Sequence, residues 1–266
     1  MKKRLDQILT ERGYYASREK AQRAILAGLI FIDGNCADKP GIKYDEEIKI
    51  EVKGCDCPYV SRGGLKLAKA LEVFRLDAAA KTVLDIGAST GGFTDCLLKH
   101  GAKKVYAVDV GYGQLHWSLR NDPRVVVVEK TNARFLNKEI IPETVDLAAI
   151  DVSFISLTKI IPAVLKLLHN EGDIITLIKP QFEAGKKMVK KGVVKEPEVH
   201  IQVLHKIISV VQELGWYLQG LDYSPLLGPE GNREFLGWWR KEKKELDLAQ
   251  LVADVVNSAH RELITS

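Results

Sequence analysis

The sequence predicts an α/β fold: a mixed seven-stranded sheet that is mostly parallel and ends in an antiparallel strand, preceded by a small α+β domain. Three observations support this prediction. Short β-branched and apolar runs alternate with segments of helical periodicity after about residue 80, which is typical of parallel sheets. Two strands then close the chain without a helix between them. The first sixty residues follow a different pattern and therefore form a separate unit.

The amino-terminal unit has two short helical stretches, residues 4–12 and 17–27. A strand over residues 29–32, a tight turn at Asp33-Gly34 and a strand over residues 48–52 follow. Residues 54–58, GCDCP, are polar and rich in turn formers, so the linker is expected near residues 54–60. The first domain is therefore predicted to span residues 1–58.

The stretch TVLDIGASTGGFTDCLLKHGAKKVYAVD, residues 82–109, indicates a ligand site. It predicts a strand over residues 82–86, a glycine-rich turn, a helix over residues 93–100 and a strand over residues 103–108. Glycines 87, 91 and 92 let a ligand approach the turn backbone, and Asp109 stands where a carboxylate can hold a ribose diol. The GxGxxG spacing and the GxxxxGK[ST] loop are both absent, which disfavours dinucleotides and P-loop nucleotides. A loop that only connects two strands is the alternative.

The alternation continues to the end of the chain. Strands are predicted over residues 124–128, 145–151 and 172–179, helices over 156–169 and 197–214, and the closing strands over 216–223 and 234–239. Asp151 and Lys179 both end parallel strands, where α/β sheets bind ligands. Residues 241–266 predict a charged amphipathic helix with Leu246, Leu251 and Val255 on one side, and we expect it to pack on the domain rather than bind a separate partner.

Asp85, Gly87 and Asp109 resemble the S-adenosyl-L-methionine site of Rossmann-like methyltransferases. Four further segments resemble the Lys-Asp-Lys-Glu tetrad of FtsJ-type ribose 2′-O-methyltransferases: SRGGLKL, DVSF, IKPQFE and NREFL. The resemblance is closest to the TlyA family, the hemolysin A-type group, and covers essentially the whole chain. One departure is Ser89-Thr90, where the FtsJ loop commonly carries a proline.

The resemblance implies an FtsJ-like domain over residues 59–240, followed by a helical extension over residues 241–266. It implies a catalytic tetrad of Lys66, Asp151, Lys179 and Glu234. It also implies S-adenosyl-L-methionine as cofactor, bound by Asp85, Gly87, Ala88, Ser89, Thr90, Gly91, Gly92, Phe93, Asp109, Asn132 and Asp151. The expected reaction is methylation of a ribose 2′-hydroxyl, of cytidine, in ribosomal RNA.

The chemistry of ribose methylation explains these residue types. The enzyme must align the 2′-oxygen with the sulfonium methyl group and deal with one proton. A neutral Lys179 can accept that proton, whereas a charged Lys179 can stabilise the developing alkoxide. Carboxylates nearby favour the charged form, and burial or a second lysine favours the neutral one. The sequence leaves both states open. Taken alone, Glu234 fits a surface ion pair and Lys66 a solvated helix face.

Basic residues indicate where RNA binds. Residues 1–30 contain seven Lys or Arg and three Asp or Glu, and their helix–helix–strand pattern resembles the RNA-binding module of the ribosomal protein S-four superfamily. The lysine tract at residues 184–195 is a candidate loop for closing on an RNA backbone. An ordinary solvated helix pair and a functionally neutral loop are the alternatives. The candidate RNA-binding residues are Arg4, Arg18, Lys20, Arg23, Arg62, Lys186, Lys187, Lys190 and Lys191.

Composition restricts the remaining classes. Four cysteines, Cys36, Cys55, Cys57 and Cys96, have no zinc-site spacing, so we expect reduced thiols and no metal. No signal peptide is evident, and no uncharged stretch approaches the roughly 20 residues that span a bilayer. A cytoplasmic protein that binds ribosomal RNA or ribosomal subunits, and neither DNA nor membrane, is expected. The alternatives are a non-catalytic ribosome assembly factor and a membrane-lytic hemolysin. The oligomeric state stays open.

Overall fold

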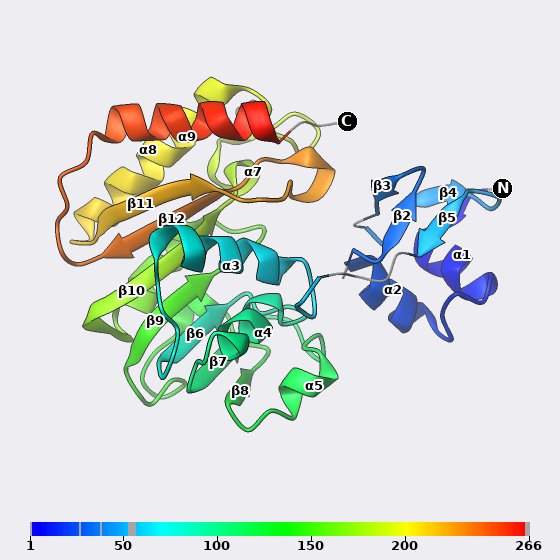
Figure 1. The fold of residues 1–266 in the computed structure, drawn as a ribbon, viewed down its shortest axis with the longest axis horizontal. Coiled ribbons are helices and arrows are strands. Elements are labelled where there is room, and N and C mark those ends of the chain that lie inside the picture. The colour runs from blue at the N-terminus through cyan, green and yellow to red at the C-terminus, as the bar shows by residue number, and fades with distance from the viewer. Residues whose placement is uncertain (1, 27, 38, 53–56, 264–266) are drawn as a thin grey trace.

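The computed structural model describes residues 2–26, 28–37, 39–52 and 57–263. Figure 1 shows a smaller amino-terminal unit and a larger unit built around a seven-stranded sheet. Residues 54–56 of the predicted linker lie outside the described residues. The predicted boundaries between the domains therefore stay predictions.

The amino-terminal unit packs two helices against small sheets. Helices α1 (Leu5–Glu11) and α2 (Arg18–Leu26) contact each other, as their sequence pattern predicts. Strand β2 (Ile30–Ile32) pairs antiparallel with β3 (Asn35–Cys36) across the tight turn and with β5 (Ile50–Val52). A ribbon of β1 (Lys2–Arg4) and β4 (Lys43–Asp45) was not predicted. Apolar side chains of both helices and of β2 form this unit's core.

The larger unit contains the predicted mixed sheet, in the order β11-β12-β10-β9-β6-β7-β8. Its strands are β6 (Thr82–Ile86), β7 (Lys104–Val108), β8 (Val125–Val128), β9 (Val145–Ile150), β10 (Leu168–Ile178), β11 (Tyr217–Tyr223) and β12 (Phe235–Arg240). Neighbouring strands from β10 to β8 pair in parallel, whereas β12 pairs antiparallel with both β10 and β11. The fold class predicted from the sequence is confirmed.

Helices cover both faces of this sheet (Figure 1). They are α3 (Gly63–Phe74), α4 (Gly92–Lys99), α5 (Trp117–Arg120), α6 (Ile161–Leu165), α7 (Pro180–Glu183), α8 (Pro197–Glu213) and α9 (Leu248–Glu262). Val83 of β6 belongs to the apolar cluster that includes α3 and α4, and the next residue, Leu84, belongs to the cluster that includes α6, α8 and α9. Successive strand residues therefore enter opposite layers, as the two-residue period requires.

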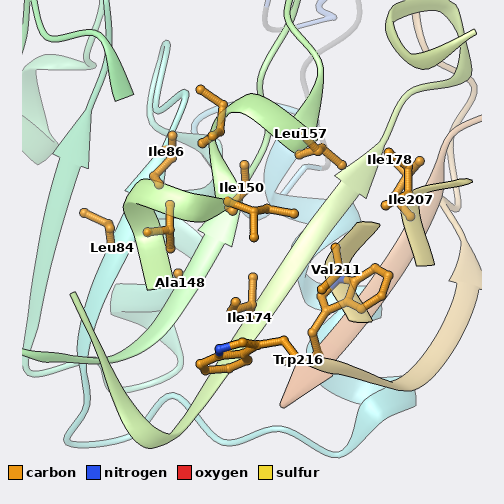
Figure 2. Close-up of a cluster of buried hydrophobic side chains, with 14 of the residues drawn as sticks. Leu84, Ile86, Ala148, Ile150, Leu157, Ile174, Ile178, Ile207, Val211 and Trp216 are labelled. Carbon is orange, nitrogen blue, oxygen red and sulfur yellow. The ribbon is translucent and has the colours of Figure 1, made fainter. Parts of the chain in front are cut away.

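The larger of these two clusters fixes the sheet against α6, α8 and α9. Figure 2 shows Leu84, Ile150 and Ile174 from three adjacent strands, with Val211 of α8 and Trp216 on the side of Ile174. Each such side chain contributes roughly 1.5–3 kcal/mol when it is fully buried. The strand ends that carry polar residues therefore project from a rigid layer.

Two predicted helices have different bounds in the structure. The helix predicted over residues 156–169 is a 3-10 turn (Leu157–Lys159) followed by the short α6, and Leu168 already pairs with Val145 in the sheet. Strand pairing here prevails over helical periodicity. The carboxyl-terminal helix starts at Leu248 rather than 241, because the Asp247 side chain accepts a hydrogen bond from Gln250 N and caps it.

The carboxyl-terminal helix packs on the domain, and the predicted Leu246, Leu251 and Val255 pack against the core at the margin of its buried face. Its fully buried stripe is Val252, Val256 and Ala259, whereas the predicted Leu251 and Val255 are only half-buried. The stripe packs against α8 and β11. The prediction missed it because polar residues lie between its members and helical spacing alone allowed either face.

Candidate active site

Polar residues at the ends of five strands meet at one edge of the sheet. Asp85 lies near the end of β6, and Asp109, Asp151 and Lys179 directly follow β7, β9 and β10. Glu234 directly precedes β12, which runs in the opposite direction, so the start of β12 lies at this same edge. Parallel strands present their carboxyl ends together, and the sequence therefore placed these residues correctly.

Two ion pairs connect the four residues of the predicted tetrad. Lys179 Nζ lies 2.5 Å from Asp151 Oδ1 and donates a hydrogen bond of 3.0 Å to Ser153 Oγ. Lys66 Nζ, from α3, donates a hydrogen bond of 2.5 Å to Glu234 Oε2. All four side chains line one cavity of about 1320 Å³. Residues far apart in the sequence thus form one polar cluster.

The electrostatics of the cluster favour ionised groups. The Lys179 side chain is 10% exposed, and burial lowers its pKa, but the Asp151 and Glu234 carboxylates outweigh burial and hold the pKa above its usual value. Burial raises the pKa of Asp151, but the charges of Lys179 and Lys66 lower it by more, so the net shift of this pKa is downward. Of the two states that the sequence left open, the resting structure therefore favours the charged Lys179.

Glu234 is completely buried, contrary to the surface position that its charge alone suggested. Its Oε1 atom has no hydrogen-bond partner within the part of the chain that the structure describes. The loop before β12 approaches it closely, because a Cβ atom added at Gly228 would lie 2.3 Å from Oε1. A glycine at position 228 therefore makes room for the carboxylate.

The glycine-rich turn after β6 forms another wall of the cavity. Gly87 has φ of +86°, and a Cβ atom there would lie 2.1 Å from the carbonyl oxygen of Asp151. Only glycine fits this position without moving the backbone. Ala88, Ser89, Thr90, Gly92 and Phe93 also line the cavity. The turn therefore exposes its backbone to a ligand beside the tetrad.

Other predicted cofactor residues lie outside the cavity lining, and Asp109 supports the turn from there. Asp109 Oδ2 accepts a hydrogen bond of 2.8 Å from Ser89 N, and Oδ1 accepts one of 2.7 Å from Gly111 N. Gly91, with φ of +97°, packs against Leu119. Asn132 caps a short 3-10 turn by accepting from Arg134 N. Asp85, Gly91, Asp109 and Asn132 do not line the cavity.

Asp85 is completely buried beneath the turn. Its Oδ2 accepts a hydrogen bond of 2.6 Å from Thr94 Oγ1, and Oδ1 has no partner among the described residues. Burial raises the pKa of Asp85 to about 7, and the neighbouring Asp151 and Asp109 carboxylates act in the same direction. Asp85 therefore binds or releases its proton near neutral pH.

The predicted RNA-binding residues differ in their surroundings. Arg4 and Arg18 both pair with the buried carboxylate of Asp6, at 2.9 Å and 3.3 Å. Burial raises the pKa of Asp6, but hydrogen bonds from Arg4, Gln22 and Arg18 outweigh it and lower the pKa well below its usual range. Arg4 and Arg18 therefore also hold the fold of the amino-terminal unit, a contact that their basic sequence context did not indicate.

The remaining basic candidates lie on the surface or at the cavity. Lys20 and Arg23 are exposed on α2, and Arg62 lines the cavity. In the lysine tract, Lys187 and Lys191 are exposed, and Lys190 pairs with Glu196 at 3.1 Å. The Lys186 side chain lies outside the described residues.

Sequence reasoning missed several residues at this edge. Ser153 and the loop at residues 225–231 line the cavity. Lys195 lines it too; it belongs to the predicted lysine tract but was not among the individual candidate RNA-binding residues. Phe154 follows Ser153, has φ of +64° and is 91% exposed, and its ring lies 5.0 Å from that of Phe182. Such a strained, exposed aromatic side chain is unusual away from a functional site. Phe154 lies three residues after Asp151 in the sequence, and this closeness to a predicted catalytic residue is the signal that could have identified it.

The described residues also bear on metal binding, on the cysteines and on membrane-spanning helices. Within them, no cluster of three or more His, Cys, Asp or Glu could hold a metal ion. Cys96 is a buried free thiol and Cys57 Sγ donates to the Ser61 carbonyl oxygen at 3.5 Å, whereas the Cys36 side chain and Cys55 lie outside the description. A search of the described helices finds none with the length and apolar character that crossing a bilayer demands.

Comparison with known proteins agrees with this geometry. The model of the FtsJ-like methyltransferase family matches residues 59–241. The chain belongs to this family. An S4 domain matches residues 3–47 of the same chain. The match to the FtsJ-like family therefore includes all four residues of the predicted tetrad.

Similar proteins match most of the chain. The 16S/23S rRNA (cytidine-2′-O)-methyltransferase TlyA of Mycobacterium tuberculosis is 45% identical over 96% of each chain. Hemolysin A of Brachyspira hyodysenteriae is 46% identical over 88% of this chain and 98% of its own. A solved structure from Streptococcus thermophilus is 43% identical, covers 98% of this chain and 96% of its own, and superposes with a TM-score of 0.78. The resemblance to the TlyA family is confirmed.

Proposed function

We propose that this FtsJ-like protein transfers a methyl group from S-adenosyl-L-methionine to a ribose 2′-hydroxyl, of cytidine, in ribosomal RNA. The observation that carries the proposal is the pair of ion pairs, Lys179–Asp151 and Lys66–Glu234, beside an exposed glycine-rich backbone. The name of the Mycobacterium tuberculosis relative supports the nucleoside and the RNA class.

The turn after β6 fits the proposed cofactor. Gly87 keeps the backbone clear of a side chain, and Ser89 N is oriented by Asp109. The predicted set, from Asp85 through the turn to Asp109 and Asn132, is proposed to hold the adenosine and methionine parts. When bound, S-adenosyl-L-methionine supplies an electrophilic methyl group. Buried carboxylates close to the turn suit its positive charge.

The tetrad is proposed to act on the 2′-oxygen of the ribose. Lys179, held as an ammonium by Asp151, would donate a hydrogen bond to the oxygen as negative charge develops. Lys66 would orient Glu234 through their ion pair. The hydroxyl proton needs an acceptor, and Glu234 Oε1 is a buried carboxylate oxygen without a hydrogen-bond partner among the described residues. We therefore assign it that proton.

The amino-terminal S4 domain is proposed to supply RNA affinity, and residues 59–240 the chemistry. Exposed Lys20 and Arg23 on α2 can contact phosphates without breaking an ion pair of the unit's core. Ribosomal RNA or ribosomal subunits are the proposed partners, which makes the cytoplasm the proposed location. A non-catalytic assembly factor or a membrane-lytic protein would have no use for the tetrad.

The direct test is to map the modification. Ribosomal subunits that lack the modification are incubated with the protein and isotope-labelled S-adenosyl-L-methionine, and the RNA is digested for mass spectrometry. We expect label on a ribose, at a nucleotide that resists alkaline cleavage because a methylated 2′-oxygen cannot attack the neighbouring phosphate. Lys179→Ala should lose about 10²–10⁴-fold in methyl transfer while keeping cofactor affinity. A base-methylated product, or full activity of this variant, would overturn the proposal.

A further inference from the structure

The end of the lysine tract forms a fixed wall of the cavity. Asn232, which is buried, accepts a hydrogen bond of 3.1 Å from Val194 N through Oδ1. Its Nδ2 donates to the carbonyl oxygens of Gly192 at 3.0 Å and Pro229 at 2.9 Å. One side chain therefore joins the tract to the loop that leads into Glu234.

Val194 is also held from its other side. His200 Nε2 lies 3.1 Å from the Val194 carbonyl oxygen, and His200 Nδ1 lies 2.9 Å from His260 Nε2. Because a carbonyl oxygen only accepts, His200 carries its proton on Nε2 and accepts from His260 through Nδ1. The Val194 side chain is buried as well. The backbone just before Lys195 is thus anchored by Asn232 on one side and His200 on the other.

The charges around the cavity leave this wall positive. Of the acids that line it, Asp151 pairs with Lys179, Glu234 with Lys66, and Glu230 with Lys39. Glu262 is near Arg261 and accepts a hydrogen bond of 2.5 Å from Tyr223 Oη. Lys195 and Arg233 also line the cavity, and the described residues place no carboxylate within ion-pair distance of either.

Arg233 and Lys195 use their charges differently. Arg233 is 9% exposed and donates to the carbonyl oxygens of Ala259 and Leu263, at the end of α9. Its guanidinium is therefore committed to the fold, although its charge still acts on the cavity. Lys195 is exposed, and its ammonium group is free to meet a ligand. An anion entering the cavity can meet the Lys195 ammonium group on this wall, and Arg62 lines the cavity as well.

We infer that Lys195 binds a phosphodiester group of the RNA beside the nucleotide that is methylated. This inference rests on the proposed function, because a cavity that admits a ribose must also admit its flanking phosphates. A lysine is a usual contact for a phosphate, and its anchored backbone keeps the ammonium group at the cavity. Lys195 differs in this respect from Lys187 and Lys191, which do not line the cavity.

The test compares Lys195→Ala with two controls on the full-length protein. Lys195→Arg keeps the charge, and Lys241→Ala removes a lysine that contacts Asn170 at the opposite edge of the sheet. The measurements are KM for unmodified ribosomal subunits at several salt concentrations, kcat, cofactor affinity by calorimetry and thermal melting. Lys195→Ala should raise KM about fivefold to tenfold. It should also make KM less dependent on salt, because RNA binding would release about one counterion fewer. Its kcat, cofactor affinity and melting temperature should match those of the wild type, as should all parameters of both controls.

Two results would overturn the inference while leaving the proposed function intact. In one, Lys195→Ala methylates ribose with the KM and salt dependence of the wild type. In the other, it loses affinity for S-adenosyl-L-methionine but not for RNA, which would assign Lys195 to the cofactor carboxylate. A wild-type protein that methylates no ribose would instead refute the proposed function, and it would be recognised before any variant is compared.

Discussion

Adjacent strands β6 and β9 end in carboxyl groups with opposite acid–base behaviour. Asp85, on β6, is completely buried and its hydrogen bonds come from Thr94 rather than from a cation, so burial raises its pKa to about 7. Asp151, after β9, is 19% exposed and pairs with Lys179, and its pKa lies below the usual value. The partner, more than burial, decides which carboxyl is charged. One sheet edge thus holds a carboxyl group with a raised pKa beside one with a lowered pKa.

A third carboxylate, Asp109 after β7, extends the comparison. Its partners are the backbone amides of Ser89 and Gly111 rather than a hydroxyl or a lysine. The three strand ends therefore divide three tasks: Asp151 holds a cation, Asp109 shapes the turn, and Asp85 supports the turn from below. Substitutions that remove one partner at a time can test this division.

The largest effect is expected for Asp151→Asn, which removes the charge but keeps the size of the side chain. Lys179 would lose its closest counter-charge, and its pKa would fall because burial would be less well opposed. We expect kcat to fall by about 10²–10³-fold, the usual cost of losing electrostatic support at a reacting oxygen. Single-turnover methyl transfer measures it. Asp146→Asn, near the other end of β9, is the control and should keep wild-type turnover. Equal losses in the two variants would show that Asp151 has no specific role in methyl transfer.

Gly228→Ala tests the second ion pair without touching its charges. The added Cβ atom would lie 2.3 Å from Glu234 Oε1, so the carboxylate must move and its contact with Lys66 must change. We expect a loss of about 10²-fold in kcat. Gly185→Ala is the matched control, because a Cβ atom there meets nothing within 4 Å. If both alanine variants retain full turnover, the position of Glu234 does not limit the reaction.

Asp85→Asn should change the pH dependence of stability. The unfolded carboxyl group titrates near pH 3.8 and the folded one near pH 7, so the folded state binds more protons between these values. The free energy of unfolding therefore falls as pH rises through this window. Asparagine does not titrate, so the variant does not lose this stability. Its free energy of unfolding relative to that of the wild type should therefore increase by roughly 1–4 kcal/mol from low to high pH. Denaturant titrations at pH 5 and pH 8 measure the difference, and parallel curves would argue against a buried, titrating Asp85.

The smallest effect is expected for Asp109→Ala. Ser89 N and Gly111 N would lose their acceptors, and the turn would be less well ordered for the cofactor. We expect affinity for S-adenosyl-L-methionine to fall about tenfold, which corresponds to about 1.4 kcal/mol. Calorimetry measures it. Asp109→Asn keeps an acceptor and should lose less, and an unchanged dissociation constant in the alanine variant would remove Asp109 from the cofactor site.

Strand-end chemistry could be predicted from the sequence, but its partners could not. Hydrophobic periodicity alone locates β6, β9 and β10, and this is enough to place Asp151 and Lys179 at one edge of the sheet. The contact between Lys66 and Glu234 joins residues 168 positions apart, and only the packing of α3 against the sheet brings them together. In the sequence, only the resemblance to a known tetrad connects those two residues.

The same limit applies to charge. Arg4 and Arg18 have the sequence context of an RNA-binding surface, yet both reach the buried Asp6. Lys195 has the same context as the other tract lysines, and its distinct position depends on Asn232 and His200, which periodicity cannot pair with Val194. Local pattern identifies which residues carry charge, and tertiary contacts decide which of those charges are available.

The contact of Arg233 with the last turn of α9 matters for how this protein is handled. The arginine next to the proposed proton acceptor donates to two carbonyl oxygens, those of Ala259 and Leu263, near the end of the described chain. Trimming the chain back into α9 would remove the carbonyl acceptors of that arginine, which directly precedes Glu234 and the start of β12. A lowered activity of protein altered at this end would then reflect the lost contacts of Arg233 as well as the intrinsic activity of the enzyme.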